Sequence, residues 1–180
     1  MMNVKKNIVA IFVSSTIIAL GMGGAHADSS VTVNVLGTVN AATCDISANT
    51  QSVNLGNAKP NMFTSVNTPV AATKQAFSIS LQNCDGVGSG QAQLKVTGPT
   101  TNAGSSYFSK DPSSIVAVSL KSGLTELSNG SLVSAGSANA EAETLNSTQV
   151  PFEVALKSSA ASPAAGIVVE APLTFSFVYN

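Results

Sequence analysis

The sequence predicts an all-β domain of the immunoglobulin-like sandwich class, and three observations lead to this prediction. Short segments in which apolar and polar residues alternate recur along the whole chain. Turn-forming pairs such as Asn129-Gly130 separate these segments at modest intervals. Two cysteines, Cys44 and Cys84, can join two of the strands. Several short strands with regular turns and one inter-strand disulfide are typical of such a sandwich.

The first residues are expected to be an export signal and not part of the fold. Lys5 and Lys6 give a positive start, residues 8–20 form an apolar run, and small residues flank position 26. This order is typical of a cleaved signal peptide, which we place at residues 1–27. A retained membrane anchor is the alternative, but the apolar run is short for crossing a bilayer.

A strand with strict alternation follows the expected cleavage site. Its residues of one parity are small or β-branched, and they are Val31, Val33, Val35, Gly37 and Val39. Such alternation indicates a strand with one buried face. By itself the pattern favours an ordinary first strand of the sandwich.

Six further strands are expected after Cys44. They cover residues 53–55, 77–84, 93–97, 115–120, 150–157 and 173–179. The segment 115–120 is apolar apart from Ser119, which indicates a strand buried on both faces. The last strand places Leu173, Phe175, Phe177 and Tyr179 on one face. Residues 137–143, rich in Ala and Glu, are expected to form a loop or one helical turn. Six strands are fewer than an immunoglobulin-like domain normally has.

The composition argues against an enzyme and against a nucleic-acid partner. The one histidine, His26, lies within the expected signal, so no imidazole base remains for the many Ser and Thr residues. The rest of the chain has no Arg and carries six Lys against nine Asp and Glu, a formal charge of −3. A mildly acidic surface without Arg does not suit nucleic acid or an anionic membrane. The glycines at 86, 88 and 90 precede a strand and not a helix, so no phosphate-binding loop and no cofactor are expected.

The two cysteines of an exported chain are expected to form a disulfide. Export exposes Cys44 and Cys84 to an oxidising compartment, where an even number of cysteines indicates pairing. A metal site is excluded, because two thiols without a histidine do not complete a tetrahedral zinc shell.

Several segments together resemble the type 1 fimbrial major-subunit family of chaperone–usher pilins. They are residues 35–44 (VLGTVNAATC), residues 77–85 (FSISLQNCD), residues 150–152 (VPF), Gly166, and the ending 175–180 (FSFVYN). Their order and spacing, together with the signal peptide, cover essentially the whole chain after residue 27. This set is more specific than any one of its motifs.

The resemblance implies an incomplete immunoglobulin-like sandwich that lacks its last strand and carries an N-terminal donor strand. Residues 28–43 would be the donor extension, with Val31, Val33, Val35, Gly37 and Val39 as its inserting face, and residues 44–180 would be the pilin domain. The face of Leu173, Phe175, Phe177 and Tyr179 would line the vacant groove or meet the chaperone. The implied partners are a periplasmic chaperone, an outer-membrane usher and other pilin subunits, joined head to tail into a surface fimbrium of a Gram-negative bacterium by strand addition.

Two other classes of function stay open at this point. A minor tip or adaptor subunit, or a glycan-binding adhesin module, would use the same fold, although a receptor-binding adhesin usually adds a lectin domain for which the chain has no room. If the chain is instead a structural subunit, host glycan would be reached through a separate tip adhesin. A small secreted enzyme is disfavoured by the missing base and the paired cysteines.

Overall fold

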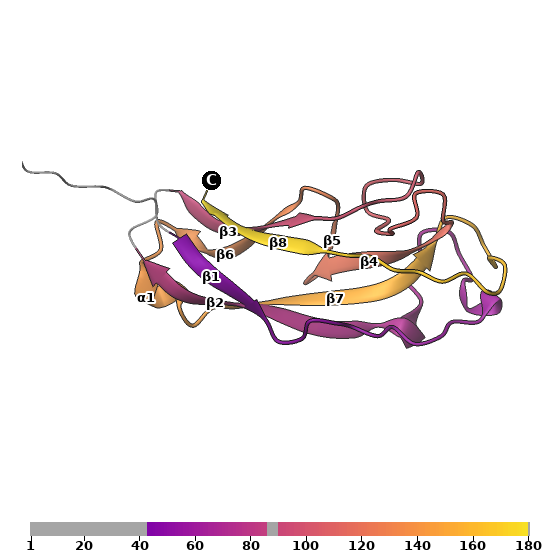
Figure 1. Ribbon diagram of the computed structural model, residues 1–180, viewed down its shortest axis with the longest axis horizontal. Coiled ribbons are helices and arrows are strands. Elements are labelled where there is room, and N and C mark those ends of the chain that lie inside the picture. The colour runs from indigo at the N-terminus through magenta and orange to yellow at the C-terminus, as the bar shows by residue number, and fades with distance from the viewer. Residues whose placement is uncertain (1–42, 86–89, 180) are drawn as a thin grey trace, which may run out of the picture. The chain divides into compact units, whose positions relative to one another are not determined.

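Two antiparallel β-sheets face each other in the computed structural model, which describes residues 43–85 and 90–179 (Figure 1). The strands are β1 (Thr43–Ala48), β2 (Gln75–Asp85), β3 (Gln91–Thr97), β4 (Val116–Ser122), β5 (Thr125–Leu127), β6 (Leu132–Ala138), β7 (Gln149–Ser158) and β8 (Thr174–Tyr179). Short helices are η1 (Pro60–Met62), η2 (Ala71–Thr73) and α1 (Ala142–Leu145). The described residues lie in one compact unit, Thr38–Asn180, and the other unit, Met1–Gly37, falls outside them. The predicted immunoglobulin-like sandwich is confirmed.

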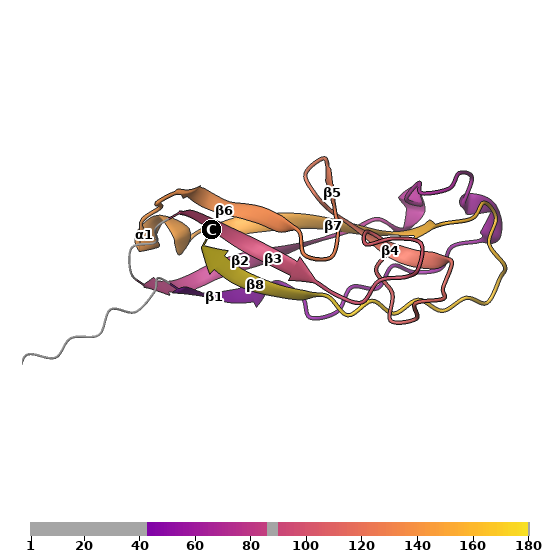
Figure 2. The ribbon, with the colours of Figure 1, turned by 90° about the horizontal axis from the view of Figure 1, so that it is seen from above.

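The first sheet has the strand order β1-β2-β7-β4-β5, and the second has the order β6-β3-β8. Strands β1 and β8 are therefore edge strands of different sheets. They approach each other along the same side of the sandwich, as the view from above shows (Figure 2). The expected signal peptide and donor strand lie outside the described residues. No helix of the described part of the chain is long and apolar enough to span a bilayer.

Alternating apolar residues supply the core between the sheets. Phe77, Ile79 and Leu81 of β2 are buried, whereas Gln75 and Gln82 are exposed. In β4 every residue from Val116 to Leu120 is buried, as the continuous apolar run predicts. Because adjacent side chains of a strand point to opposite faces, this strand is covered on both sides.

Three phenylalanines link the two sheets across the core. Phe77 lies opposite Phe152 in the β2–β7 register, and their rings stack with centroids 5.4 Å apart. Phe175 of the second sheet places its ring 4.9 Å from that of Phe152 and 5.8 Å from that of Phe77. Aromatic pairs in this range add to the stabilisation that burial alone provides.

The strand predicted at residues 53–55 does not form, so this prediction is wrong. Pairing of β1 with β2 ends at Ala48, because the Ser78 N–H donates to the Asn49 side chain (3.0 Å) where a longer β1 would supply a backbone carbonyl. Val53 and Leu55 are instead partly buried against the core outside any strand.

Strands β1, β5 and β6 are not among the strands expected from the sequence. The helical candidate at 137–143 is one short turn that begins later, at Ala142.

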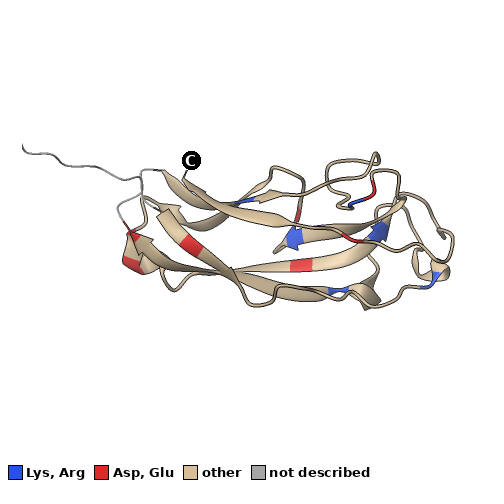
Figure 3. Ribbon diagram, in the orientation of Figure 1, with Lys and Arg blue, Asp and Glu red and all other residues tan. Residues whose placement is uncertain are grey.

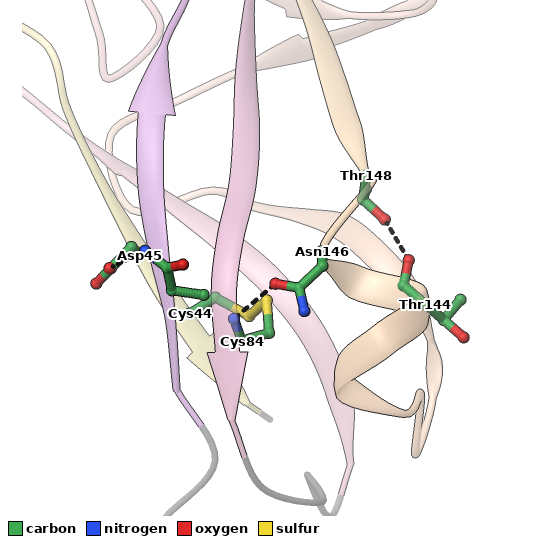
Figure 4. The surroundings of a disulfide bond; sticks show 7 residues. Cys44, Asp45, Cys84, Thr144, Asn146 and Thr148 are labelled. Carbon is green, nitrogen blue, oxygen red and sulfur yellow. Dashed lines mark hydrogen bonds between the residues drawn. A yellow bond between two sulfur atoms is a disulfide. The ribbon is translucent and has the colours of Figure 1, made fainter.

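A disulfide between Cys44 and Cys84 fastens the edge strand β1 to β2 (Figure 4). The predicted pairing of the two cysteines is confirmed. Nearby, the Cys84 N–H donates to Asn146 Oδ1 (2.7 Å), so the residue after α1 holds the same point of β2. The Asn83 side chain also donates to Asp45 Oδ2 across the two strands (3.0 Å).

We predict that replacing both cysteines with alanine (Cys44→Ala, Cys84→Ala) lowers the free energy of unfolding by about 4 kcal/mol. The bond spans 40 residues, and opening a loop of this length gives the unfolded chain more conformational freedom. Urea unfolding under non-reducing conditions measures the change. Reduced wild-type protein is the control and should match the double variant. Two free thiols in the exported wild-type protein would contradict the prediction.

Candidate functional site

An apolar groove lies where the two edge strands stop. Beyond the end of β1 the chain continues through residues 49–58, and before β8 it passes through residues 163–173, neither of which forms a strand. We call these two segments the groove walls. Between them is a cavity of about 1140 Å³.

The floor of the groove comes from the inward-facing residues of the first sheet. Its central residues are Phe77 and Ile79 of β2, Val116 and Val118 of β4, and Val154 and Leu156 of β7. Each of these belongs to the alternating or continuous apolar pattern that makes its strand. A cavity thus lies against the sandwich core along one edge, between the two groove walls.

The walls offer backbone and small side chains. Within the described residues, the segment 163–173 takes part in one backbone–backbone hydrogen bond, from the Lys110 N–H to the Glu170 carbonyl (2.7 Å). In residues 50–58 the described hydrogen bonds are local, such as that from the Gly56 N–H to Asn54 Oδ1 (2.8 Å). Backbone groups of an exposed edge can pair with an added strand.

The groove is nearly uncharged. Glu170 is the one charged residue among the described residues that line it, and its carboxylate pairs with Lys110 at 3.2 Å, with both side chains largely exposed. Charged residues are also sparse over the rest of the described chain (Figure 3). An apolar occupant therefore fits the site better than a charged ligand.

The structure brings half of the predicted C-terminal face to the groove. Leu173 and Phe175 line it. Phe177 and Tyr179 lie further along β8, where they pack against the core and place their rings 5.1 Å apart. The predicted donor residues Val31, Val33, Val35, Gly37 and Val39 fall outside the described residues.

The walls themselves could not be found from the sequence. Residues 163–173 have no alternation, and the pattern at 53–55 indicates a strand that does not form. Their role is visible only when the floor beneath them is known. No cluster of residues suited to a metal ion occurs within the part of the chain that the structure describes.

One glycine allows a wall to approach the second sheet. A Cβ on Gly98, at the end of β3, would lie 2.8 Å from the Pro172 carbonyl oxygen and 3.0 Å from Leu173 Cδ2. The backbone of Pro172 cannot move aside as a flexible side chain would. A side chain at position 98 would therefore displace the wall formed by residues 163–173.

Comparisons with known proteins show which sequences and structures this chain resembles. The sequence model of the fimbrial protein family matches residues 30–180. No curated protein is similar enough to the chain to count as a match.

Many solved structures resemble the chain, and three of them are as follows. The P pilus rod subunit PapA superposes with a TM-score of 0.54 at 21% identity, covering 83% of this chain and 99% of the other. A subunit from a chaperone–usher pilus, from a study of rod uncoiling, has a TM-score of 0.50 at 21% identity, covering 85% and 97%. The CupB6 tip adhesin of Pseudomonas aeruginosa has a TM-score of 0.51 at 18% identity, over 68% of this chain and 33% of the adhesin. At these identities the likeness concerns the fold.

We predict that Gly98→Ala lowers the free energy of unfolding by about 1–3 kcal/mol, the usual cost of overpacking. Because Pro172 and Leu173 line the groove, the NMR signals of the Leu173 methyl groups should also shift. Gly136→Ala is the matched control, since its Cβ would meet the end of the Leu145 side chain (2.6 Å) away from the groove. It should cost stability without moving the Leu173 signals. Unchanged Leu173 signals in Gly98→Ala would contradict the prediction.

Proposed function

The chain belongs to the fimbrial protein family, and from this membership we propose that it is a structural subunit of a chaperone–usher fimbria that polymerises by donor-strand exchange. The observation that carries the proposal is the nearly uncharged apolar groove between the walls 49–58 and 163–173. Its floor is part of the sandwich core, and its walls are segments outside the sheets. A strand added there would complete the sandwich.

The proposed occupant is the extension 28–43 of a neighbouring copy. Its face of Val31, Val33, Val35 and Val39 has the apolar character of the groove. Burying four Val side chains gives roughly 6–8 kcal/mol before ordering costs. Each added backbone hydrogen bond contributes about 1 kcal/mol more. An interaction of this size, repeated along a fibre, supports a persistent filament.

The geometry of such an exchange explains why a filament forms and not a closed dimer. The donor segment precedes the domain and the groove lies within it, so each copy uses two different surfaces. A contact of this kind is heterologous, and it builds an open fibre unless the rotation happens to close a ring.

The route to the fibre follows from the same groove. In this proposal residues 1–27 direct export and are removed. A periplasmic chaperone then covers the groove, and the next subunit's extension replaces it at the outer-membrane usher. The mature fibre lies on the surface of a Gram-negative cell, and any host glycan is bound by a separate tip adhesin.

We predict that Gly37→Leu blocks fibre formation while the subunit still folds. Gly37 lies in phase with the valines, and glycine within a strand often marks a place where another chain comes close. A leucine there should cost about 1–3 kcal/mol or more by overpacking. Electron microscopy of cells should show few fibres, and the variant should accumulate with the chaperone in the periplasm.

Thr38→Leu is the matched control for Gly37→Leu. In the proposed donor strand its side chain would point to the other face, so fibres should form at close to the wild-type level. Normal fibre formation by Gly37→Leu would contradict this register of the donor strand. The ordinary first-strand interpretation would then be favoured.

We also predict that the exported chain has no hydrolase or transferase activity of its own. Within the proposed mature chain no histidine is available as a base for a serine nucleophile. A serine-reactive fluorophosphonate probe should leave the pure folded protein unlabelled, with a serine hydrolase as the positive control. Stoichiometric labelling at one serine would overturn this part of the proposal.

A further inference from the structure

Lys157 is fully buried at the end of β7, although its place in the alternating pattern predicts a solvent-facing side chain. It is 0% exposed. Its neighbour in the chain, Leu156, points to the other face of the strand and lines the groove. The ammonium group therefore lies behind the groove floor, on the outer face of the first sheet.

Four residues from three separate segments surround this ammonium group. Lys157 Nζ donates to Glu126 Oε1 (2.8 Å), Ser106 Oγ (2.9 Å) and Asn67 Oδ1 (3.1 Å), and it lies 3.8 Å from the centre of the Tyr107 ring. Three acceptors match the three N–H donors of a protonated lysine, and the ring face adds an attraction for the cation. We refer to these five residues as the Lys157 cluster.

The Lys157 cluster joins parts of the chain that are distant in sequence. Asn67 belongs to the segment between η1 and η2, Ser106 and Tyr107 to the connection between β3 and β4, and Glu126 to β5. One side chain thus holds three peripheral segments against β7. The alternation of apolar residues at 150, 152, 154 and 156 predicts that Lys157 lies on the opposite, outer face of the strand, and gives no sign of this role.

Electrostatics indicates that the cluster fixes positions more than it adds stability. Burial lowers the pKa of Lys157, and the hydrogen bond and charge of Glu126 oppose this effect only in part. Burial and Glu126 also raise the pKa of Tyr107. The loss of hydration thus offsets much of the attraction, and in such cases an apolar side chain of similar size can be equally stable.

A set of backbone contacts connects the cluster to the end of the groove. The Asn67 N–H donates to the Ser158 carbonyl (2.9 Å), and the Val70 N–H donates to the Leu156 carbonyl (2.8 Å). The same segment carries Phe63, which is 4% exposed and lines the groove. The Phe63 carbonyl in turn accepts the Ser162 N–H (3.1 Å), directly before the wall at 163–173 begins.

We propose that Lys157 is a positioning residue for strand capture, whose ammonium group holds the segment 63–70 on β7 and so keeps Phe63 and the adjoining wall in the shape that accepts a strand. The proposal rests on the function proposed above. In this proposal, contacts on the opposite face of the first sheet support the shape of the groove.

Asn67 offers the most selective test. Its φ of 62° is in the left-handed region, so Asn67→Gly keeps the backbone conformation and removes only the acceptor for Lys157. Asn67→Asp should restore the contact, since aspartate tolerates the same conformation and accepts from an ammonium group. Asn139→Gly, at another asparagine with positive φ (55°) that is bonded to Gly90, is the matched control.

Two measurements on the full mature chain separate this role from a general loss of stability. Hydrogen exchange of the Val70 amide should quicken in Asn67→Gly and in Lys157→Met, and that of the Asn67 amide should quicken in Lys157→Met. The affinity for a labelled synthetic peptide of residues 28–43 should fall by roughly 5- to 20-fold in both variants, within the usual range for coupling between sites. Asn67→Asp, Asn139→Gly and Lys74→Met, which removes an exposed ion pair with Glu153 on the same strand, should all behave as wild type.

The outcomes distinguish the two proposals. If the wild-type chain does not bind the peptide, the donor-strand function fails, and the exchange measurement alone still tests whether Lys157 holds the segment. If wild type binds but Asn67→Gly and Lys157→Met bind with the same affinity, Lys157 has no positioning role. If Lys157→Met does not fold, Asn67→Gly and its rescue by Asn67→Asp decide the question.

Discussion

The apolar floor of the groove, beneath the walls 49–58 and 163–173, is the constraint on which the rest of this structure depends. A sandwich is stabilised because the inner faces of its sheets are removed from water, at about 25 cal/mol per Å² of apolar surface. Along one edge the two inner faces leave a cavity between them, lined by Ile79, Val118 and Val154, which are only 3%, 8% and 4% exposed. Apolar cavities of this kind are typical binding sites. The groove thus joins the stability of the subunit to its assembly.

An open groove requires that its surroundings keep their shape without the missing strand. At one end of the domain the disulfide and the Cys84–Asn146 hydrogen bond hold β1 to the first sheet. The Phe77–Phe152–Phe175 contacts tie the two sheets together behind the groove. At the other end Phe63 and Val70, which belong to the segment that the Lys157 cluster holds, pack with Val116 in a small apolar cluster. Covalent, aromatic and polar contacts thus support different parts of the domain around the groove.

The alternation of apolar and polar residues made the core strands predictable. Features that depend on tertiary contacts could not be predicted in this way. The pattern around Phe77 and Phe152 gave β2 and β7 because each apolar residue faces the same buried layer. Strand β6 was not predicted because only Val133 and Ala135 of its residues are buried, which is too short an apolar pattern to indicate a strand. Gly136 interrupts the pattern, since Leu145 occupies the space that a side chain would need.

The site was predictable only in part, for a related reason. Leu173 and Phe175 could be named from the last strand, but the wall segments have no period of their own. Lys157 occupies a position in the alternating pattern that predicts an exposed side chain. It is buried because three distant segments fold over it. The hydrophobic period of a strand shows which of its residues share a face. It does not show that distant segments cover one of those residues.

The central claim is that the groove of one copy is filled by the extension of another. A density map of the assembled fimbria at side-chain detail, obtained by cryo-electron microscopy of fibres sheared from cells, tests this most directly. The account predicts that residues 31–39 of each subunit lie between the walls 49–58 and 163–173 of its neighbour, with the valines directed at the floor. A groove filled by the subunit's own N-terminal segment, or closed by direct pairing of its walls, would contradict it.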